Sequence, residues 1–142
     1  MKTVSYDAHS GGASLYENAA WRLVEALATL RKPDGTVTID GFYDDVRKPT
    51  PQQLAHLKTV PFEEAKLKAI YGAARFVGGR SGSEAQVAQL FAPTCNIAGI
   101  WSGWTGNDAT TLTPAQAHVQ RDTRLVPRPV PVKHEQQLRA PP

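Results

Sequence analysis

Residues 94–126 decide the fold: they read TCNIAGIW (94–101), SGWTGND (102–108), TLTP (111–114) and AHVQRDTRLV (117–126). The first and last of these stretches are typical of strands, because apolar and β-branched residues recur within them. The glycine-rich stretch between them predicts a loop, and residues 111–114 predict a short extended segment. Two longer strands joined through a loop therefore form the framework to which the rest of the chain is added.

Upstream of this framework, the segment ending at residue 30 predicts an amphipathic helix. Its apolar residues recur at spacings of three and four, which places them on one helical face: Ala20, Leu23, Val24, Leu27 and Leu30. Two starts are open, either a capping box of Ser14 with Glu17 or an N-cap at Asn18. The helix should end before Pro33.

Two more strands and a helical insertion complete the expected elements. Weak alternation predicts a strand at residues 2–6, and TVTI predicts another at 36–39. Residues 49–92 are interpreted as an insertion of short helices. The expected helix signals are Thr50 with Pro51 and Gln53 for the first helix, Phe62 to Tyr71 ending near Gly72 for the second, and Ser83 with Gln86 before Pro93 for the third.

Composition and charge argue against several functional classes. The net charge is +3, of which +2 lies from residue 127 onward, so we expect no basic face of the kind that binds nucleic acid. The single cysteine, Cys95, rules out an internal disulfide. No apolar run reaches the roughly 20 residues of a membrane helix, and the N-terminus has no signal-peptide core. We therefore expect a soluble cytoplasmic protein without a membrane partner.

Six short motifs, in order along residues 7–127, together resemble one protein family. They are DAHSG at 7–11, NAA at 18–20, IDGFYD at 39–44, NIAGI with the following SG and TG at 96–106, TLTPA at 111–115 and RLVP at 124–127. The resemblance is to the dinuclear zinc exopeptidases, which include carnosinase, aminoacylase, acetylornithine deacetylase and succinyl-diaminopimelate desuccinylase. It is strongest to the carnosinase-like dipeptidases.

The resemblance implies a fold and a partner. Members have a larger domain that holds two zinc ions and a smaller dimerisation, or lid, domain that pairs with its twin. The lid is a ferredoxin-like α+β fold, an antiparallel sheet with helices on one face. This chain would cover most of the lid at residues 1–126, including the insertion at 49–92, and would be incomplete at its C-terminal end. Residues 127–142 would be a proline-rich tail, disordered or exchanged between subunits.

The resemblance also suggests roles for three residues. His9, in the DAHSG motif, is the catalytic candidate, reaching across the dimer to stabilise the oxyanion of the tetrahedral intermediate. Thr111 and Arg124 are the substrate-binding candidates, with Arg124 holding a substrate carboxylate through its planar guanidinium. Without the family pattern, each could be an ordinary loop or strand residue. Arg121 and Thr123 occupy positions that are usually apolar in the family, which predicts that the last strand is either exposed or shifted.

No metal site is expected in this chain itself, and two zinc or manganese ions would belong to the intact enzyme. The pair Glu63 and Glu64 lies among lysines, where surface ion pairs are the ordinary outcome. The four histidines, His9, His56, His118 and His134, have no ligand spacing. Trp101 and Trp104 either pack in the core, which we favour, or line the dimer seam.

Three hypotheses follow for the function. The first is a lid segment of a zinc dipeptidase or N-acyl-amino-acid hydrolase that contributes residues in trans and works as a homodimer. It would depend on a metal-binding catalytic domain, for which a separate partner chain is one hypothesis. The second is a free-standing, non-catalytic self-association module. The third is a decayed gene fragment, for which Arg121 and the proline-rich end are the arguments. On all three, the chain alone is expected to be inactive.

Overall fold

A computed structural model describes residues 1–124, which form two compact units. The first combines Met1–Leu30 with Cys95–Thr123, and the second combines Arg31–Thr94 with Arg124, the last described residue. The proposed tail, residues 127–142, lies outside the described residues. The predicted α+β class is confirmed, since helices accompany two antiparallel two-stranded sheets.

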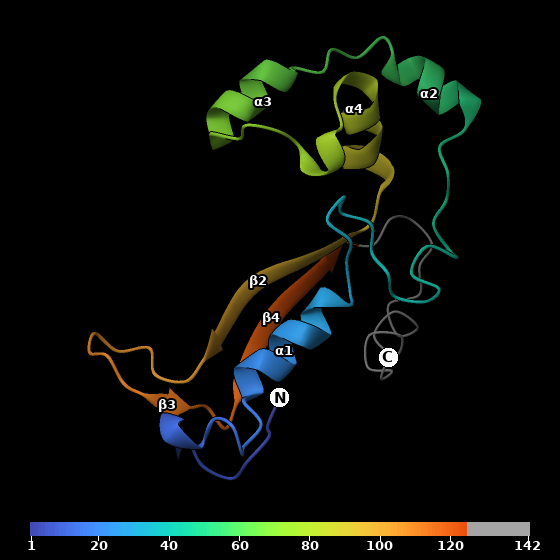
Figure 1. Cartoon of the computed structure of the whole chain (residues 1–142). Helices are drawn as coiled ribbons and strands as arrows, with labels where there is room; N and C mark the ends of the chain where they lie inside the picture. Colours follow the sequence, from blue (N-terminus) through green and yellow to red (C-terminus); the bar gives the residue numbers. More distant parts are fainter. Residues whose placement is uncertain (125–142) are drawn as a thin grey trace. The chain divides into compact units, whose positions relative to one another are not determined.

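The larger sheet joins the two strands that the sequence predicts most clearly. They are β2 (Thr94–Ser102) and β4 (Ala117–Arg124), which lie side by side in Figure 1. Asn96 contacts Asp122, whereas Ser102, further along β2, contacts Gln116, further back along the chain. The contacts advance along one strand as they retreat along the other, so the strands run antiparallel.

Helix α1 (Ala19–Ala28) covers one face of this sheet (Figure 1). Asn18 is its N-cap, and its side-chain oxygen accepts from the backbone N–H groups of Ala20 at 2.8 Å and Trp21 at 3.3 Å. Of the two predicted starts, Asn18 is therefore correct. The core beneath the helix consists of Ala19, Leu23 and Ala117, with Leu27 and Val119 packed against them. The small alanines let the helix approach β4 closely.

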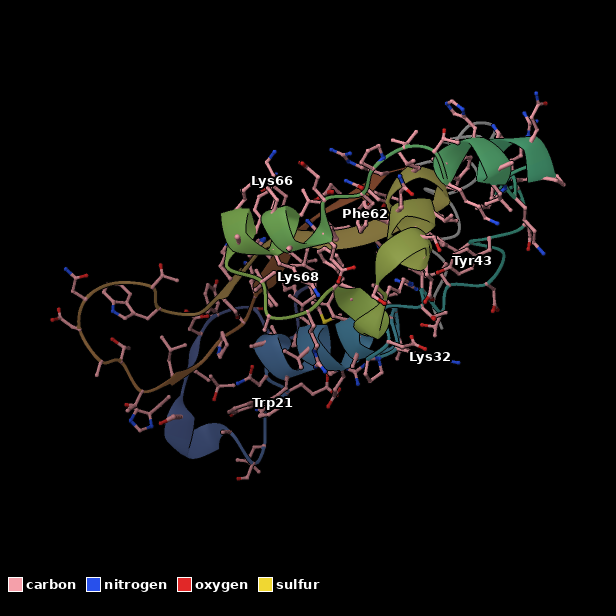
Figure 2. The ribbon with its side chains drawn as sticks, turned by 90° about the horizontal axis from the view of Figure 1, so that it is seen from above. Trp21, Lys32, Tyr43, Phe62, Lys66 and Lys68 are labelled. Carbon is pink, nitrogen blue, oxygen red and sulfur yellow. The ribbon has the colours of Figure 1, made fainter. Side chains whose placement is uncertain are left out.

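The other apolar residues of α1 depart from the prediction. Val24 is 46% exposed, so it does not lie on the buried face, and Trp21 is 66% exposed and projects from the helix (Figure 2). Leu30 lies beyond the last helical residue, in a tighter turn where its N–H donates to Leu27. The helix thus presents a second, exposed apolar strip.

Side chains on neighbouring strands contact each other across the β2–β4 sheet. Asn96 Nδ2 donates to Asp122 Oδ1 at 2.8 Å. The Trp101 ring stacks on the His118 ring, with ring centroids 5.3 Å and planes 7° apart. Both contacts link β2 to β4.

Residues of β4 alternate between covered and exposed along the whole strand, including Arg121 and Thr123, for which the sequence raised doubt. Ala117 is buried and Val119, Arg121 and Thr123 are half-buried, whereas the intervening residues are exposed. The strand is therefore not shifted within the described residues. Arg121 is only partly covered, so its charge keeps contact with water and avoids the large penalty of full burial.

A smaller sheet pairs β1 (Ala8–His9) with β3 (Leu112–Thr113), and the short 3₁₀ helix η1 (Ser10–Gly12) follows β1. The predicted strand at residues 2–6 is wrong. Only an isolated bridge between Lys2 and Gln116 occurs there, and the strand forms later, at Ala8 and His9. The short extended segment predicted at 111–114 is confirmed by β3.

The second unit contains helices α2 (Pro51–Leu57), α3 (Glu64–Tyr71) and α4 (Gly82–Phe91), with the 3₁₀ helix η2 (Val77–Gly79) between the last two. The Thr50–Gln53 capping box is confirmed, and Gly72 ends α3 in the left-handed conformation with φ 60°. Ser83 is not a cap, because α4 already begins at Gly82. Within residues 1–124, no helix has the length and apolar character needed to cross a membrane.

The predicted strand at residues 36–39 is also wrong, for a local reason. Thr36 N–H donates to Asp34 Oδ1 and Val37 N–H donates to the Tyr43 hydroxyl, so side chains satisfy the backbone that a strand partner would otherwise satisfy. A single bridge between Arg31 and Val37 remains. Tyr43 also packs edge-on against the buried Phe42.

Glu64 ties α3 to the start of α4. Its Oε2 accepts from Gly82 N–H and its Oε1 from Lys68 Nζ, each at 2.7 Å. Lys68 also lies over the Phe76 ring at 5.0 Å, and it projects from the opposite side of α3 to Lys66 (Figure 2). The Gly82 hydrogen bond, followed by the Lys68 interaction, holds the pKa of Glu64 below its ordinary value of 4.5.

We expect this link to be lost in acid. Because the folded-state pKa of Glu64 is the lower one, the carboxylate stabilises the fold above about pH 4.5, and the contribution disappears as the pH falls through the folded-state value. In an NMR titration, the Gly82 amide proton should shift with a midpoint below 4.5, and Glu64→Gln should abolish that shift. A midpoint at or above the ordinary value would refute this assignment.

Candidate functional site

The β1–β3 ladder brings together two of the three candidate residues. His9 pairs with Leu112 and Ala8 with Thr113, and the N–H of Ser10 donates to the carbonyl of Thr111 at 3.4 Å. His9 and Thr111 therefore lie one register step apart on adjacent segments, although they are 102 positions apart in the sequence. Both residues are exposed, so their side chains are accessible to a molecule outside this unit.

A backbone hydrogen bond selects the tautomer of the neutral His9 ring. Gly11 N–H donates to His9 Nδ1 at 3.0 Å. An imidazole nitrogen that accepts cannot carry a proton, so the neutral ring carries its proton on Nε2. His9 can thus offer an N–H donor from the nitrogen furthest from its own backbone, which is the group that an oxyanion requires.

Glycine at position 11 leaves room for this ring. A Cβ added there would lie 3.1 Å from His9 Nδ1 and 3.6 Å from its neighbouring ring carbon. The first of these contacts is tighter than ordinary packing, so the imidazole would have to move by a few tenths of an ångström. Gly11 therefore donates the hydrogen bond to the His9 ring and, because it has no side chain, leaves space beside that ring.

Arg124 does not belong to this ladder. It lies at the end of β4, in the second unit, and its backbone N–H donates to the Thr94 hydroxyl at 3.2 Å. Its side chain is exposed. The predicted carboxylate-binding role of Arg124 therefore stays a prediction.

Sequence reasoning missed two features near the candidate residues. Asp7 was noted only as part of a motif, yet its Oδ1 accepts from the backbone N–H of Ala115 at 2.8 Å. His118 was noted only for lacking ligand spacing, yet it stacks on Trp101. Trp101 and Trp104 are 48% and 57% exposed, so the prediction that they pack in the core is wrong. A ring stack between strands and a side-chain-to-backbone bond leave no sequence period that could have revealed these contacts.

The described residues do not fit a metal site of their own. Within residues 1–124, no group of three or more histidine, cysteine, aspartate or glutamate side chains could hold an ion. The glutamate pair forms the predicted surface ion pairs, Glu63 with Lys66 at 2.8 Å and Glu64 with Lys68 at 2.7 Å. No step of a reaction can be assigned to a metal held by these side chains.

These features define a class of protein: a small α+β domain that displays an exposed histidine and, within residues 1–124, no cluster of metal ligands. The family follows from comparison with known proteins. The chain belongs to the peptidase dimerisation domain family, whose model matches residues 5–141. The family resemblance inferred from the six motifs is therefore confirmed.

Relatives of known identity agree with this assignment. The chain is 30% identical over 125 residues to the Cys-Gly metallodipeptidase dug1 of Schizosaccharomyces pombe, covering 87% of this chain and 26% of that protein. Its structure is similar to that of an M20 family metallo-carboxypeptidase from Sulfolobus solfataricus, with a TM-score of 0.87 and 33% identity, covering 97% of this chain and 36% of the other.

The fold is shared with two further dipeptidases. Human carnosine dipeptidase 1 gives a TM-score of 0.85 at 22% identity, and the di-peptidase Dug1p of Saccharomyces cerevisiae gives 0.84 at 23%. Each match covers 96% of this chain and 29% of the other. The chain therefore spans about a quarter to a third of the length of the relatives it matches.

Proposed function

We propose that this chain is the dimerisation, or lid, segment of a metal-dependent dipeptidase or N-acyl-amino-acid hydrolase. The observation that carries the proposal is the match of residues 5–141 to the peptidase dimerisation domain, together with the dipeptidase relative that the chain resembles. A separate catalytic domain would hold two zinc or manganese ions. This chain would supply residues that act on the substrate in trans, within a homodimer in the cytoplasm.

The proposed contribution to catalysis follows from the donors on the chain. Hydrolysis of an amide passes through a tetrahedral intermediate whose oxygen becomes negatively charged. His9 Nε2–H would donate to that oxygen at the partner's site, because charge that develops in the transition state rewards a donor already in place. The Thr111 hydroxyl would bind the substrate beside it, and Arg124 would hold the substrate's carboxylate through paired hydrogen bonds.

Exposed apolar side chains support the self-association part of the proposal. In the first unit, large ones lie on α1 and along β2 and the following loop: Trp21, Val24, Ile97, Ile100, Trp101 and Trp104. Exposed aromatic side chains such as these tryptophans are enriched at protein–protein interfaces. The same property would serve a non-catalytic self-association module, which remains the second candidate because residues 1–124 hold no metal-ligand cluster.

We expect the purified chain to form a dimer. Sedimentation velocity should give a species of twice the 15.4 kDa chain mass, with the dimer fraction rising as the concentration rises. A folded chain that stays monomeric over the whole accessible concentration range would contradict both the lid proposal and the self-association alternative.

A further inference from the structure

The N-terminal segment pairs with residues 111–117 in two separate places. In the first, the Met1 amino group donates to the Ala117 carbonyl at 2.7 Å, Ala117 N–H returns a bond to Met1 at 3.0 Å, and Thr3 N–H donates to the Ala115 carbonyl at 3.0 Å. In the second, β1 pairs with β3 and places His9 opposite Leu112. Both pairings are antiparallel, but they do not form one continuous ladder.

Between them the two segments differ in length. Four residues, 4–7, separate Thr3 from Ala8 on the N-terminal side, whereas only Pro114 separates Thr113 from Ala115 on the other. Proline has no N–H to offer a partner strand. Residues 4–7 cannot all pair with the opposite segment, so they must leave the ladder. The position of His9 therefore depends on where the N-terminal segment pairs with residues 111–117 again.

Asp7 is the residue at which the chain rejoins. In an antiparallel pair bonded as Thr3 and Ala115 are, Ala115 N–H would ordinarily return a bond to the Thr3 carbonyl. It donates to Asp7 Oδ1 at 2.8 Å instead. Ala115 is buried, and a buried N–H needs an acceptor, so the carboxylate takes the place of the missing strand partner.

We propose that Asp7 is a positioning residue for His9: its carboxylate clamps the chain just before β1 to the buried backbone that follows β3. The clamp fixes the chain at Asp7, two residues before His9 and one before β1 begins, and Gly11 N–H then fixes the ring from the other side. The catalytic significance of the clamp rests on the role proposed above for His9, whereas the clamp itself does not. Asp7 touches no substrate in this scheme and acts only through His9.

The rest of the first unit is held without Asp7. Thr3 Oγ1 donates to the Glu17 carbonyl at 2.8 Å, and Ala19 N–H donates to the Pro114 carbonyl at 3.1 Å. Together with the Met1–Ala117 bonds, these contacts attach the N-terminus and α1 to residues 114–117. Loss of the carboxylate should therefore loosen residues 4–11 while the core around Leu23 stays intact.

The test compares amide exchange and the His9 ring by NMR in the full chain and three variants. In Asp7→Ala, exchange of the Ala115 amide should accelerate by at least about tenfold, as expected when a hydrogen bond is removed. The Gly11 amide should also exchange faster, and the His9 Nδ1 resonance should move toward that of a free imidazole. The Ala117 amide, in the first ladder, should keep its protection.

Two further variants separate positioning from general destabilisation. Asp7→Asn keeps an oxygen acceptor and should restore the wild-type values. Asp122→Ala removes an exposed carboxylate that accepts only from Asn96 on the sheet, and should leave the Ala115 and Gly11 amides unchanged. Wild-type exchange and an unmoved His9 resonance in Asp7→Ala would overturn the proposal. That result would leave the role of His9 in hydrolysis untouched, since that role is tested by activity.

Discussion

Leu23→Ala is expected to lower the free energy of unfolding by about 2–5 kcal/mol, the usual range for a leucine truncated in a core. Leu23 is 7% exposed, and its buried neighbours in the cluster are the alanines Ala19 and Ala117. Those neighbours are too small to fill the space that the leucine leaves, so the cavity should persist. Urea denaturation followed by circular dichroism measures the loss.

Glu25→Ala is the matched control for this variant. Glu25 lies two residues further along α1 and its side chain is 63% exposed, so its truncation should change stability by no more than about 0.5 kcal/mol. If the two variants unfold at the same urea concentration, the α1–β4 cluster is not the core of this unit.

His9→Ala should have the largest effect on activity. It can be measured in a domain-exchange enzyme, in which this chain replaces the matching third of the Sulfolobus solfataricus relative. Removal of one preorganised oxyanion donor lowers kcat by roughly 10²–10³-fold. His9→Gln should recover part of the loss, because its side-chain amide can still donate.

His56→Ala provides the comparison for His9. His56 lies exposed on α2, in the second unit, and is not part of the β1–β3 ladder. Its kcat should equal that of the unmodified domain-exchange enzyme. A His9→Ala variant with the same kcat as His56→Ala would remove the catalytic part of the proposed function.

Local signals in the sequence predicted those elements whose ends are set by their own residues. Asn18 caps α1, Thr50 and Gln53 cap α2, and Gly72 ends α3, each through bonds within a few residues. The strands β2 and β4 are long enough for their composition to dominate. In these places propensity, capping and burial favour the same structure.

Elements that depend on distant partners were predicted poorly. Residues 36–39 have strand-like composition, but the Tyr43 hydroxyl and the Asp34 carboxylate satisfy their backbone instead. Helix α4 begins at Gly82 and not after Ser83 as predicted. The Gly82 N–H donates to the carboxylate of Glu64, which lies 18 residues earlier. Such long-range side-chain contacts have no signature in the periodicity of a segment.

The candidate site shows the same division. The DAHSG motif pointed to His9, and TLTPA pointed to Thr111, but only the pairing of β1 with β3 shows that the two residues are neighbours. The Nε2–H form of His9 depends on Gly11, and the placement of β1 depends on Asp7. Sequence resemblance therefore suggested the chemistry, and the structure supplied the geometry that can support it.

The most direct test of the central claim is a dipeptidase assay with added zinc or manganese. It compares this chain alone, the Sulfolobus solfataricus relative without its matching segment, and the domain-exchange enzyme that combines them. We predict hydrolysis only by the combination. Residues 1–124 of this chain hold no cluster of metal ligands, and the shortened relative lacks the donor that His9 would supply. Hydrolysis by this chain alone, at a rate matching that of the combination, would contradict the account.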